Sequence, residues 1–338
     1  RPPSFTLLPY TTLFRSLQGI ADKVGVSVAT VSRVLSKTKL RNTKTEIAVI
    51  SAAKKLGYPY LPAKFNDVKL KNIVFITQLE EGEFYLSLFK GFHETSVGTN
   101  YRFTLISLKD KKKPISEIVN INKTYDAGCI FLPSLNEEDY LRIKEGCYSI
   151  PIVSLAPIPT PIINTITFDS YSGGNIMAKH FYESGFNDVG IIYGKPNLAE
   201  ANNRKNGFLD FVNRHKSMSL LWEYNGDYGT NSGKKAFHDF NENGFKNNIA
   251  IFSCNDTMAL GFLREATANR MNIPKDLKLA GYDDIPMCKN TIPSLTSITT
   301  NYRDIARQVI LYLEQKTNDL KGHLYLVPVS LAKRKSTS

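Results

Sequence analysis

Short runs rich in β-branched and aromatic residues alternate with amphipathic helical stretches from residue 72 to the end of the chain. The runs read NIVFIT, GCIFLP, PIVSLA, NTITFD, DVGIIYG, IAIFSCND and LKLAGYDD, and two clear helical stretches span residues 173–184 and 304–316. This alternation predicts parallel sheets with helices on both faces. Because about ten strands exceed what one such sheet normally holds, we expect two doubly wound lobes, divided near PIPTPI, with a cleft between them.

Composition excludes several classes of protein. The chain has 338 residues, of which 42% are hydrophobic, and no apolar run long enough to span a membrane, so we expect a globular cytoplasmic protein. The four cysteines form no CxxC pair and the five histidines no HxxxH spacing, so we expect neither disulfides nor a metal site, and no cofactor. No GxSxG or Walker A motif is present, and we do not expect an enzyme.

Positive charge is concentrated near the beginning of the chain. The net charge is +12, and residues 17–71 alone hold eleven Lys or Arg against three Asp or Glu. Such a block is typical of a surface that binds a nucleic-acid backbone, although a basic surface that is merely solvated is the alternative. Residues 1–15 resemble a translated adapter artefact more than a natural leader, and we expect them to be non-native or disordered.

The basic segment has the pattern of a helix-turn-helix. We expect a first helix over residues 17–24 that ends at Gly25, and a second helix capped by Ser27. In the second helix the apolar side chains share one face, which should be buried, and are Val31, Val34 and Leu35. Small and basic side chains share the other face, namely Val28, Ala29, Ser32 and Arg33. A third helix should begin with a capping box formed by Thr43 and Glu46 and end near Gly57.

The stretches LQGIADKVGVSVATVSRVLS and TEIAVISAAKKLGY resemble the DNA-binding headpiece of the LacI/GalR family of bacterial repressors. One departure is Gly19, where the family usually has an acidic residue. The resemblance implies a helix-turn-helix domain over residues 16–58 that binds double-stranded operator DNA. It also implies a set of DNA-contacting residues, which comprises Ser27, Val28, Ala29, Thr30, Ser32, Arg33, Asn42 and Lys44.

The same resemblance extends over about 95% of the chain and implies a homodimer whose core has the type I periplasmic-binding-protein fold. In that fold the chain crosses between the lobes three times, and we place the crossings near Pro159, Pro286 and Gly322. The core should then span residues 72–338. The expected lobes are residues 72–159 with 287–322, and residues 160–286 with 323–338.

Between the headpiece and the core, residues 59–71 should form a hinge. Family members usually place an A-R-x-L helix here, and its leucine enters the minor groove of the operator. This chain is shorter and lacks that motif. Pro62 can still begin a short helix, with Leu61 or Phe65 as the residue that enters the groove.

Ligands of doubly wound sheets bind at the carboxyl ends of the strands, where this chain has several polar residues. By resemblance, Arg204, Asn255 and Asp283 are expected to hold effector hydroxyls, with Tyr228 and Tyr302 as aromatic walls. Helix capping is the alternative for Asn255 and the favoured interpretation for its neighbour Asp256. Asp284 has the pattern of a turn residue. Another departure is Leu155, which stands where sugar-binding relatives often have Asp.

These features together predict a DNA-binding repressor of carbohydrate genes, with a galactoside as the expected effector between the lobes. A purine-responsive regulator of the same family is the main alternative, in which the cleft takes a nucleobase. A solute-binding protein shares the two-lobed fold, but it would not carry a basic headpiece.

Overall fold

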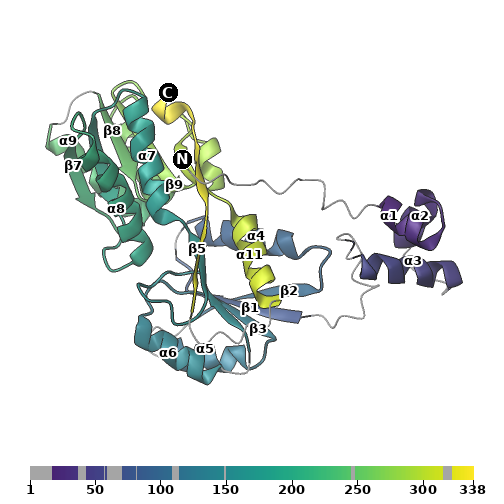
Figure 1. Cartoon of the computed structure of the whole chain (residues 1–338). Coiled ribbons are helices and arrows are strands. Elements are labelled where there is room, and N and C mark those ends of the chain that lie inside the picture. The colour runs from purple at the N-terminus through teal and green to yellow at the C-terminus, as the bar shows by residue number, and fades with distance from the viewer. Residues whose placement is uncertain are drawn as a thin grey trace, which may run out of the picture. The chain divides into compact units, whose positions relative to one another are not determined.

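A computed structural model describes residues 17–36, 43–56, 58, 71–80, 82–108, 114–147, 150–244, 248–314 and 322–338 (Figure 1). The chain divides into two units, one formed by residues 1–71 with 96–102 and the other by residues 72–95 with 103–338. The expected leader, the hinge with Leu61 and Phe65, and Asn42 lie outside the described residues. No helix in the described ranges is both long and apolar enough to cross a membrane.

The first unit contains three short helices, α1 (Leu17–Val24), α2 (Val28–Ser36) and α3 (Lys44–Lys55). Their boundaries follow from local hydrogen bonds. Gly25 has a φ of 73°, the left-handed conformation that ends α1. The Ser27 hydroxyl accepts a hydrogen bond from the backbone N–H of Thr30 at 3.1 Å, which caps α2.

The predicted capping box at the start of α3 is present as well. The Thr43 hydroxyl accepts from the Glu46 backbone N–H at 3.3 Å, and the Glu46 carboxylate accepts from the Thr43 N–H at 3.2 Å. The apolar faces of the three helices form one small core, which includes Ile20, Ala21, Val31, Val34, Leu35, Val49 and Ala53. The predicted helix-turn-helix is therefore confirmed.

The second unit contains two six-stranded sheets. The first has the order β11-β5-β4-β3-β1-β2, and its strands are β1 (Lys71–Thr77), β2 (Tyr101–Ser107), β3 (Ala127–Phe131), β4 (Ile152–Ser154), β5 (Thr165–Phe168) and β11 (Leu324–Val327). The second has the order β12-β10-β9-β8-β6-β7, and its strands are β6 (Asp188–Tyr193), β7 (Ser219–Asn225), β8 (Ile249–Ser253), β9 (Leu277–Asp283), β10 (Thr296–Thr300) and β12 (Val329–Ala332). Apart from the antiparallel pair β10–β12, the strand pairs of defined register run parallel, as predicted.

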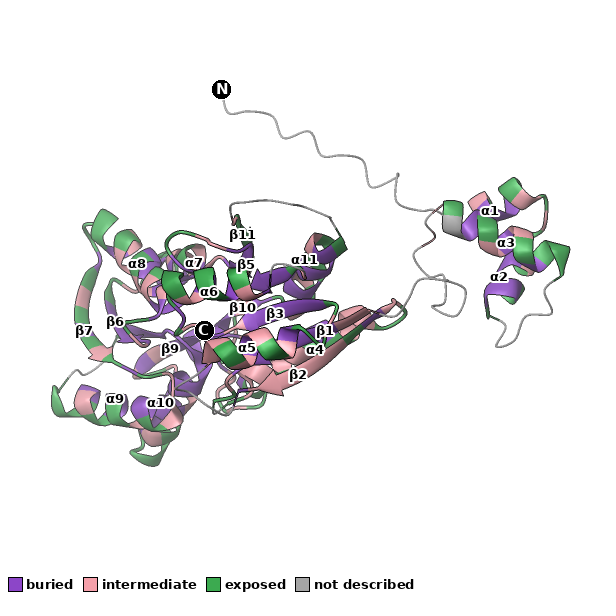
Figure 2. Ribbon diagram, turned by 90° about the horizontal axis from the view of Figure 1, so that it is seen from below, coloured by how far each residue is buried: buried purple, intermediate pink, exposed green. Residues whose placement is uncertain are grey.

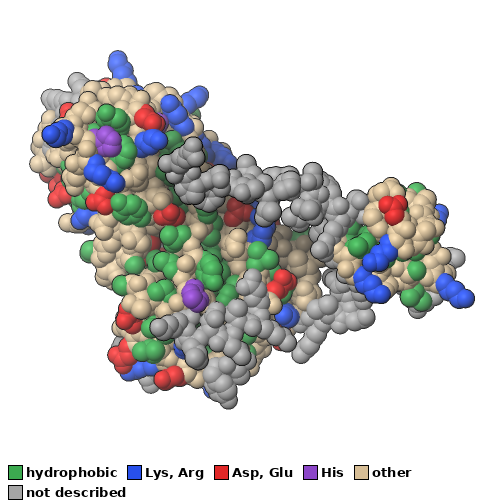
Figure 3. Space-filling model, in the orientation of Figure 1, with side chains coloured by type: hydrophobic (Ala, Val, Ile, Leu, Met, Phe, Trp, Pro, Cys, Tyr) green, Lys and Arg blue, Asp and Glu red, His purple; other side chains and the backbone are tan. Residues whose placement is uncertain are grey.

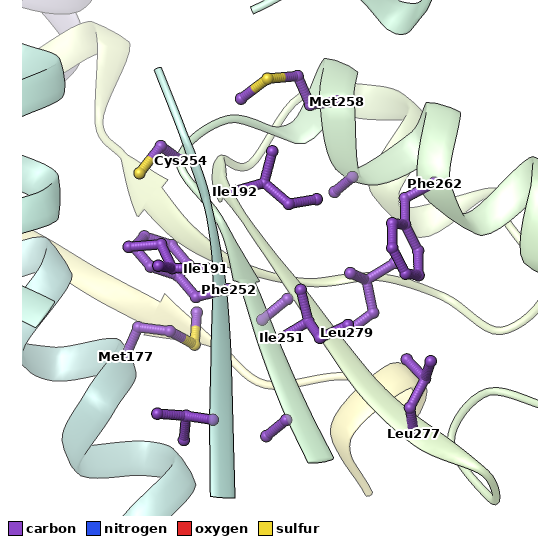
Figure 4. Close-up of a cluster of buried hydrophobic side chains, with 14 of the residues drawn as sticks. Met177, Ile191, Ile192, Ile251, Phe252, Cys254, Met258, Phe262, Leu277 and Leu279 are labelled. Atoms are coloured by element: carbon purple, nitrogen blue, oxygen red, sulfur yellow. The ribbon is translucent and has the colours of Figure 1, made fainter. Parts of the chain in front are cut away.

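Helices connect most of these strands and cover the sheets, so that buried residues line the strands and exposed residues lie on the outer helices (Figure 2). The helices are α4 (Phe84–Ser96), α5 (Pro114–Asn122), α6 (Glu137–Gly146), α7 (Ser170–Glu183), α8 (Ala199–Arg214), α9 (Thr230–Glu242), α10 (Asp256–Ala268) and α11 (Tyr302–Glu314). Figure 4 shows part of the second lobe's core, where Ile191, Ile251 and Phe252 project from the sheet toward side chains of the covering helices, such as Met177 and Phe262.

The three crossings between the lobes differ from their predicted positions. Strand β5 belongs to the first sheet while α7, directly after it, packs against α8 of the second lobe, so the first crossing is at Asp169. The second lies at Asn301, between β10 of the second sheet and α11, which contacts β5. The third is at Pro328, between β11 and β12 (Figure 1). The predicted boundaries at Pro159, Pro286 and Gly322 are therefore wrong.

The physical reason is that proline and glycine mark turns, whereas the crossings are short links that directly follow strands. Pro286 begins a 3-10 helix, η3 (Pro286–Lys289), that remains in the second lobe. Gly322 is required for a close approach, because a Cβ there would lie 2.5 Å from the Ile163 carbonyl oxygen. Neither feature requires the chain to change lobes.

Candidate functional site

A cavity of about 380 Å³ is lined by side chains from both lobes, and we call it the cleft cavity. The first lobe contributes aromatic rings, which are Phe84 and Tyr85 of α4 and Phe131 at the end of β3. The second lobe contributes mainly polar groups, which are Lys195, Glu200, Arg204, Tyr228, Asn255 and Asp283. Phe131, Asn255 and Asp283 lie where parallel strands end, the position at which this class of sheet binds ligands.

Arg204 and Asp283 form a buried ion pair at this edge. One guanidinium nitrogen, Nη2, lies 3.1 Å from Asp283 Oδ1, and Nη1 donates to the Cys254 carbonyl oxygen at 2.6 Å. The guanidinium also stacks on the Tyr282 ring, 3.8 Å from its centroid. Burial raises the pKa of Asp283 and the adjacent arginine opposes that rise. Asp283 has a φ of 107°, a strained backbone conformation that turns its side chain at the strand end.

Asn255 serves a structural role within the same wall. Its Oδ1 accepts from the Met258 backbone N–H at 2.9 Å, which caps α10, and its Nδ2 donates to the Tyr228 carbonyl oxygen at 2.9 Å. The capping interpretation of Asn255 is thus confirmed, and its amide also holds the Tyr228 loop. Tyr228 has a φ of 75° and places its ring in the cavity wall, with the Arg204 guanidinium 5.8 Å from the ring centroid.

Two expectations require correction. Tyr302 is not among the residues that line the cleft cavity, because its hydroxyl donates to the Asp283 carbonyl oxygen at 3.0 Å and its ring packs edge-on against Phe168. Asp256 does not cap α10. Its buried carboxylate accepts from the Ile285 N–H at 2.9 Å and from the Ser297 hydroxyl at 2.7 Å, so it joins α10 to the segments around β9 and β10.

Asp284 is more than a turn residue. Its backbone φ is 53°, as a turn allows, but its carboxylate pairs with Arg334 and accepts from the Thr299 hydroxyl at 3.0 Å. This ion pair is only partly exposed and joins the C-terminal segment to the end of β9. It lies outside the residues that line the cleft cavity.

The sequence patterns missed Glu200, the first-lobe aromatic rings and Lys195. Glu200 is 9% exposed, and its Oε2 has no hydrogen-bond partner among the described residues. Arg204 Nε and the Tyr228 hydroxyl also have no hydrogen-bond partner among the described residues. One available signal was the spacing of Glu200 and Arg204, which are four residues apart and therefore lie on the same face of α8.

The expected DNA-contacting side chains of the first unit that are described lie at its surface. Ser27, Ala29, Ser32, Arg33 and Lys44 are exposed, while Val28 and Thr30 are half-buried. One of these side chains also has a structural role, because the Ser27 hydroxyl caps α2. Lys and Arg side chains are prominent on the face of this unit seen in Figure 3.

Comparison with known proteins yields two family matches. Residues 16–59 match the family described as bacterial regulatory proteins, lacI family, and residues 178–337 match the periplasmic binding protein-like domain. Among curated proteins, the chain is 29% identical over 312 residues to the HTH-type transcriptional repressor PurR of Haemophilus influenzae, with 91% of this chain and 93% of that protein covered. The PurR of Proteus mirabilis is 27% identical over 291 residues, covering 84% of each chain.

Solved structures show the same fold. The lac repressor dimer bound to operator and the anti-inducer ONPF has a TM-score of 0.69 at 24% identity, and covers 95% of this chain and 98% of its own. A complex of the transcriptional regulator CelR with cellobiose has a TM-score of 0.67 at 21% identity, with 95% and 99% covered. The headpiece motif, the two-lobed core and these matches agree, and the chain combines a helix-turn-helix domain of the lacI family of bacterial regulatory proteins with a periplasmic binding protein-like domain.

Proposed function

We propose that this chain is a sequence-specific DNA-binding repressor, active as a homodimer, whose affinity for its operator is controlled by a small molecule in the cleft cavity. The observation that carries the proposal is the presence, in one chain, of a helix-turn-helix with an exposed basic face and a cavity lined by charged, polar and aromatic side chains from both lobes. The curated relatives are named as transcriptional repressors, which supports this direction of control.

On the DNA side, Arg33 is exposed in α2 next to the small side chains of Ala29 and Ser32. A helix of this kind fits the major groove, where an arginine pairs with guanine O6 and N7 and small apolar groups contact thymine methyls. We propose that the exposed face of α2 reads the operator in this manner, with the excess positive charge of residues 17–71 serving the phosphate backbone. A hinge helix with Leu61 or Phe65 in the minor groove stays a prediction.

On the ligand side, two classes of effector compete. A sugar is favoured by the abundance of hydrogen-bonding groups, and two structures with the same fold are named for complexes with cellobiose and ONPG. A purine is favoured by the curated relatives, which are named PurR. The rings of Phe84 and Tyr85 lie 5.6 and 5.9 Å from that of Phe131, measured between ring centroids, so the three form one aromatic cluster in the cavity lining. Such a cluster also favours a planar ligand, which stacks on aromatic rings.

A direct comparison of sugars, galactosides among them, with purines is therefore needed. Arg204 uses one N–H of Nη1 on the Cys254 carbonyl oxygen and one N–H of Nη2 on Asp283, which reduces the number of its donors that are available to vicinal hydroxyls. We expect thermal unfolding of the full chain with galactose, lactose, cellobiose, hypoxanthine, guanine and adenine to separate the classes. A ligand at 100 times its Kd adds about 2.7 kcal/mol of stability, which is readily measured.

Repression itself is tested by selecting DNA from a random pool with the full chain and measuring its affinity with and without the stabilising ligand. The proposal predicts one enriched palindromic sequence and a ligand-dependent Kd. Enrichment of no sequence would contradict DNA recognition. A Kd that is indifferent to every stabilising ligand would contradict control through the cleft cavity.

A further inference from the structure

Glu80 and Lys195 form an ion pair that joins the two lobes. Glu80 follows β1 of the first sheet, and Lys195 follows β6 of the second sheet. The Lys195 Nζ donates to both carboxylate oxygens of Glu80, at 3.1 and 3.0 Å. By contrast, the Arg204–Asp283 pair lies within the second lobe. The Glu80–Lys195 pair therefore resists a separation of the lobes at this point.

The pair lies at the mouth of the cleft cavity. Both side chains belong to the cavity lining, and 48% of the Glu80 side chain and 32% of the Lys195 side chain are exposed. The corresponding values for Arg204 and Asp283, which line the same cavity, are 8% and 7%. The cavity thus has one buried ion pair in its wall and a second ion pair where it meets the solvent.

Two further contacts bring the chain after β1 close to the second lobe. The Glu83 carboxylate accepts a hydrogen bond from the Met287 backbone N–H at 3.0 Å. Gly82 has a φ of 107°, and a Cβ there would lie 2.9 Å from the Thr257 hydroxyl oxygen. These contacts keep the two lobes near each other at the same edge, so the ion pair can break without a separation of the whole cleft.

The strength of the pair suits a reversible closure. A partly exposed ion pair contributes little net stability, equivalent to a factor of about two to five in an equilibrium constant. Salt weakens it further, because charges in contact with solvent are screened. Such a pair favours a closed mouth without preventing its opening. The Arg204–Asp283 pair is unsuited to this role, since breaking it would leave buried charges uncompensated.

We propose that Glu80 and Lys195 form an electrostatic latch, which keeps the mouth of the cleft cavity closed when no ligand is bound and slows the passage of ligand in both directions. The latch acts on the rates of entry and exit, and not on the contacts that recognise the ligand. The inference rests on the proposed function only in taking the cleft cavity as the ligand site.

The first experiment needs no ligand and measures access to the cavity. Leu198 lines the cavity and is 7% exposed, and the four native cysteines are buried. In a full-length Leu198→Cys protein, the rate of modification by N-ethylmaleimide, an uncharged reagent, reports how often the mouth opens. Adding Glu80→Gln should raise this rate by about two- to fivefold at low salt. The increase should be smaller at high salt, which already screens the latch in the parent protein.

The matched control is Glu138→Gln, which removes an exposed ion pair with Arg142 within α6 and should leave the modification rate unchanged. Glu80→Lys alone should raise the rate, because it places two like charges together. Combining it with Lys195→Glu reverses the pair and should return the rate close to that of the parent. Equal rates with and without Glu80→Gln at low salt, or a reversed pair that stays as reactive as Glu80→Lys, would overturn the latch.

The second experiment measures ligand exchange with the full chain, from the broadening of the ligand's own NMR signals. The probes are galactose, lactose, cellobiose and hypoxanthine, which are uncharged and are therefore not steered by the charge of the protein. Glu80→Gln should raise the association and dissociation rate constants together by about two- to fivefold and change the Kd by less than about twofold. Added salt should accelerate association in the parent protein and not in the variant.

Unchanged rate constants in Glu80→Gln would overturn the latch. A rise in the dissociation rate constant alone would overturn it as well, because that result indicates damage to the ligand contacts. If no probe binds, the proposed effector classes fail. The cysteine experiment then still decides whether the ion pair closes the mouth, so the two failures are distinguishable.

Discussion

Nη2 of Arg204 lies 3.1 Å from Oδ1 of Asp283, and less than a tenth of either side chain is exposed. The pair joins α8 to the end of β9, two elements that otherwise contribute separately to the cavity wall. Because water cannot replace either partner at this depth, the pair determines the shape of the wall as well as its charge.

Asp283→Asn should lower the free energy of unfolding by about 3 kcal/mol, because the Arg204 charge would remain buried without its counter-ion. Asparagine tolerates the positive φ of this position, so the loss reports on charge and not on the backbone. Urea unfolding measures the change. The matched control is Glu94→Gln, which removes the solvent-exposed Arg303–Glu94 pair and should cost much less than Asp283→Asn. Equal losses in the two variants would contradict the importance of burial.

Gly207→Ala should disturb the site from a distance. A Cβ at Gly207 would lie 1.9 Å from the Tyr171 carbonyl oxygen, so α8 must move away from α7 and take Glu200 and Arg204 with it. We expect a loss of about 1–3 kcal/mol, the usual cost of overpacking, together with weaker ligand binding. Asn203→Ala, an exposed change in the same helix, should alter stability by no more than about 0.5 kcal/mol. Chemical denaturation and calorimetry on both variants provide the comparison.

Arg33→Ala should cost about 1–3 kcal/mol of binding free energy on the selected operator and relax the preference at one base pair of each half-site. The reason is that a bidentate contact to guanine distinguishes that base from the other three. Competition assays with single-base operator variants measure both effects. A loss of the same size on every DNA sequence would instead identify Arg33 as a phosphate contact.

The headpiece could be predicted closely because its boundaries depend on contacts within four residues, such as Ser27 with Thr30 and Thr43 with Glu46. The cavity wall was partly predictable, since strand ends placed Asn255 and Asp283 at one edge. The crossings were not, because they depend on which strands pair. The pairing of β5 with β11 joins segments that are more than 150 residues apart in sequence and that carry no local marker of their lobe.

The positions of Glu200 and Tyr302 at the site also depend on tertiary packing, which local sequence patterns do not reveal. The strand-end rule identifies an edge but not which side chains are directed into the cavity, and the Tyr302 hydroxyl is directed to the Asp283 backbone. Glu200 is in a helix, where an acidic residue in the first turn ordinarily interacts favourably with the helix dipole at the surface. Its burial results from the packing of the two lobes around it, which no local pattern encodes.

The central claim is that occupation of the cleft cavity changes the affinity of the headpiece for DNA. Fluorescence anisotropy with the full chain and its selected operator, at fixed salt and with a saturating amount of the stabilising sugar or purine, measures this coupling directly. We predict that the ligand changes the Kd by about tenfold or more in the wild type, and much less in Asp283→Asn at the same ligand concentration. The same Kd for the wild type with and without saturating ligand would contradict the claim.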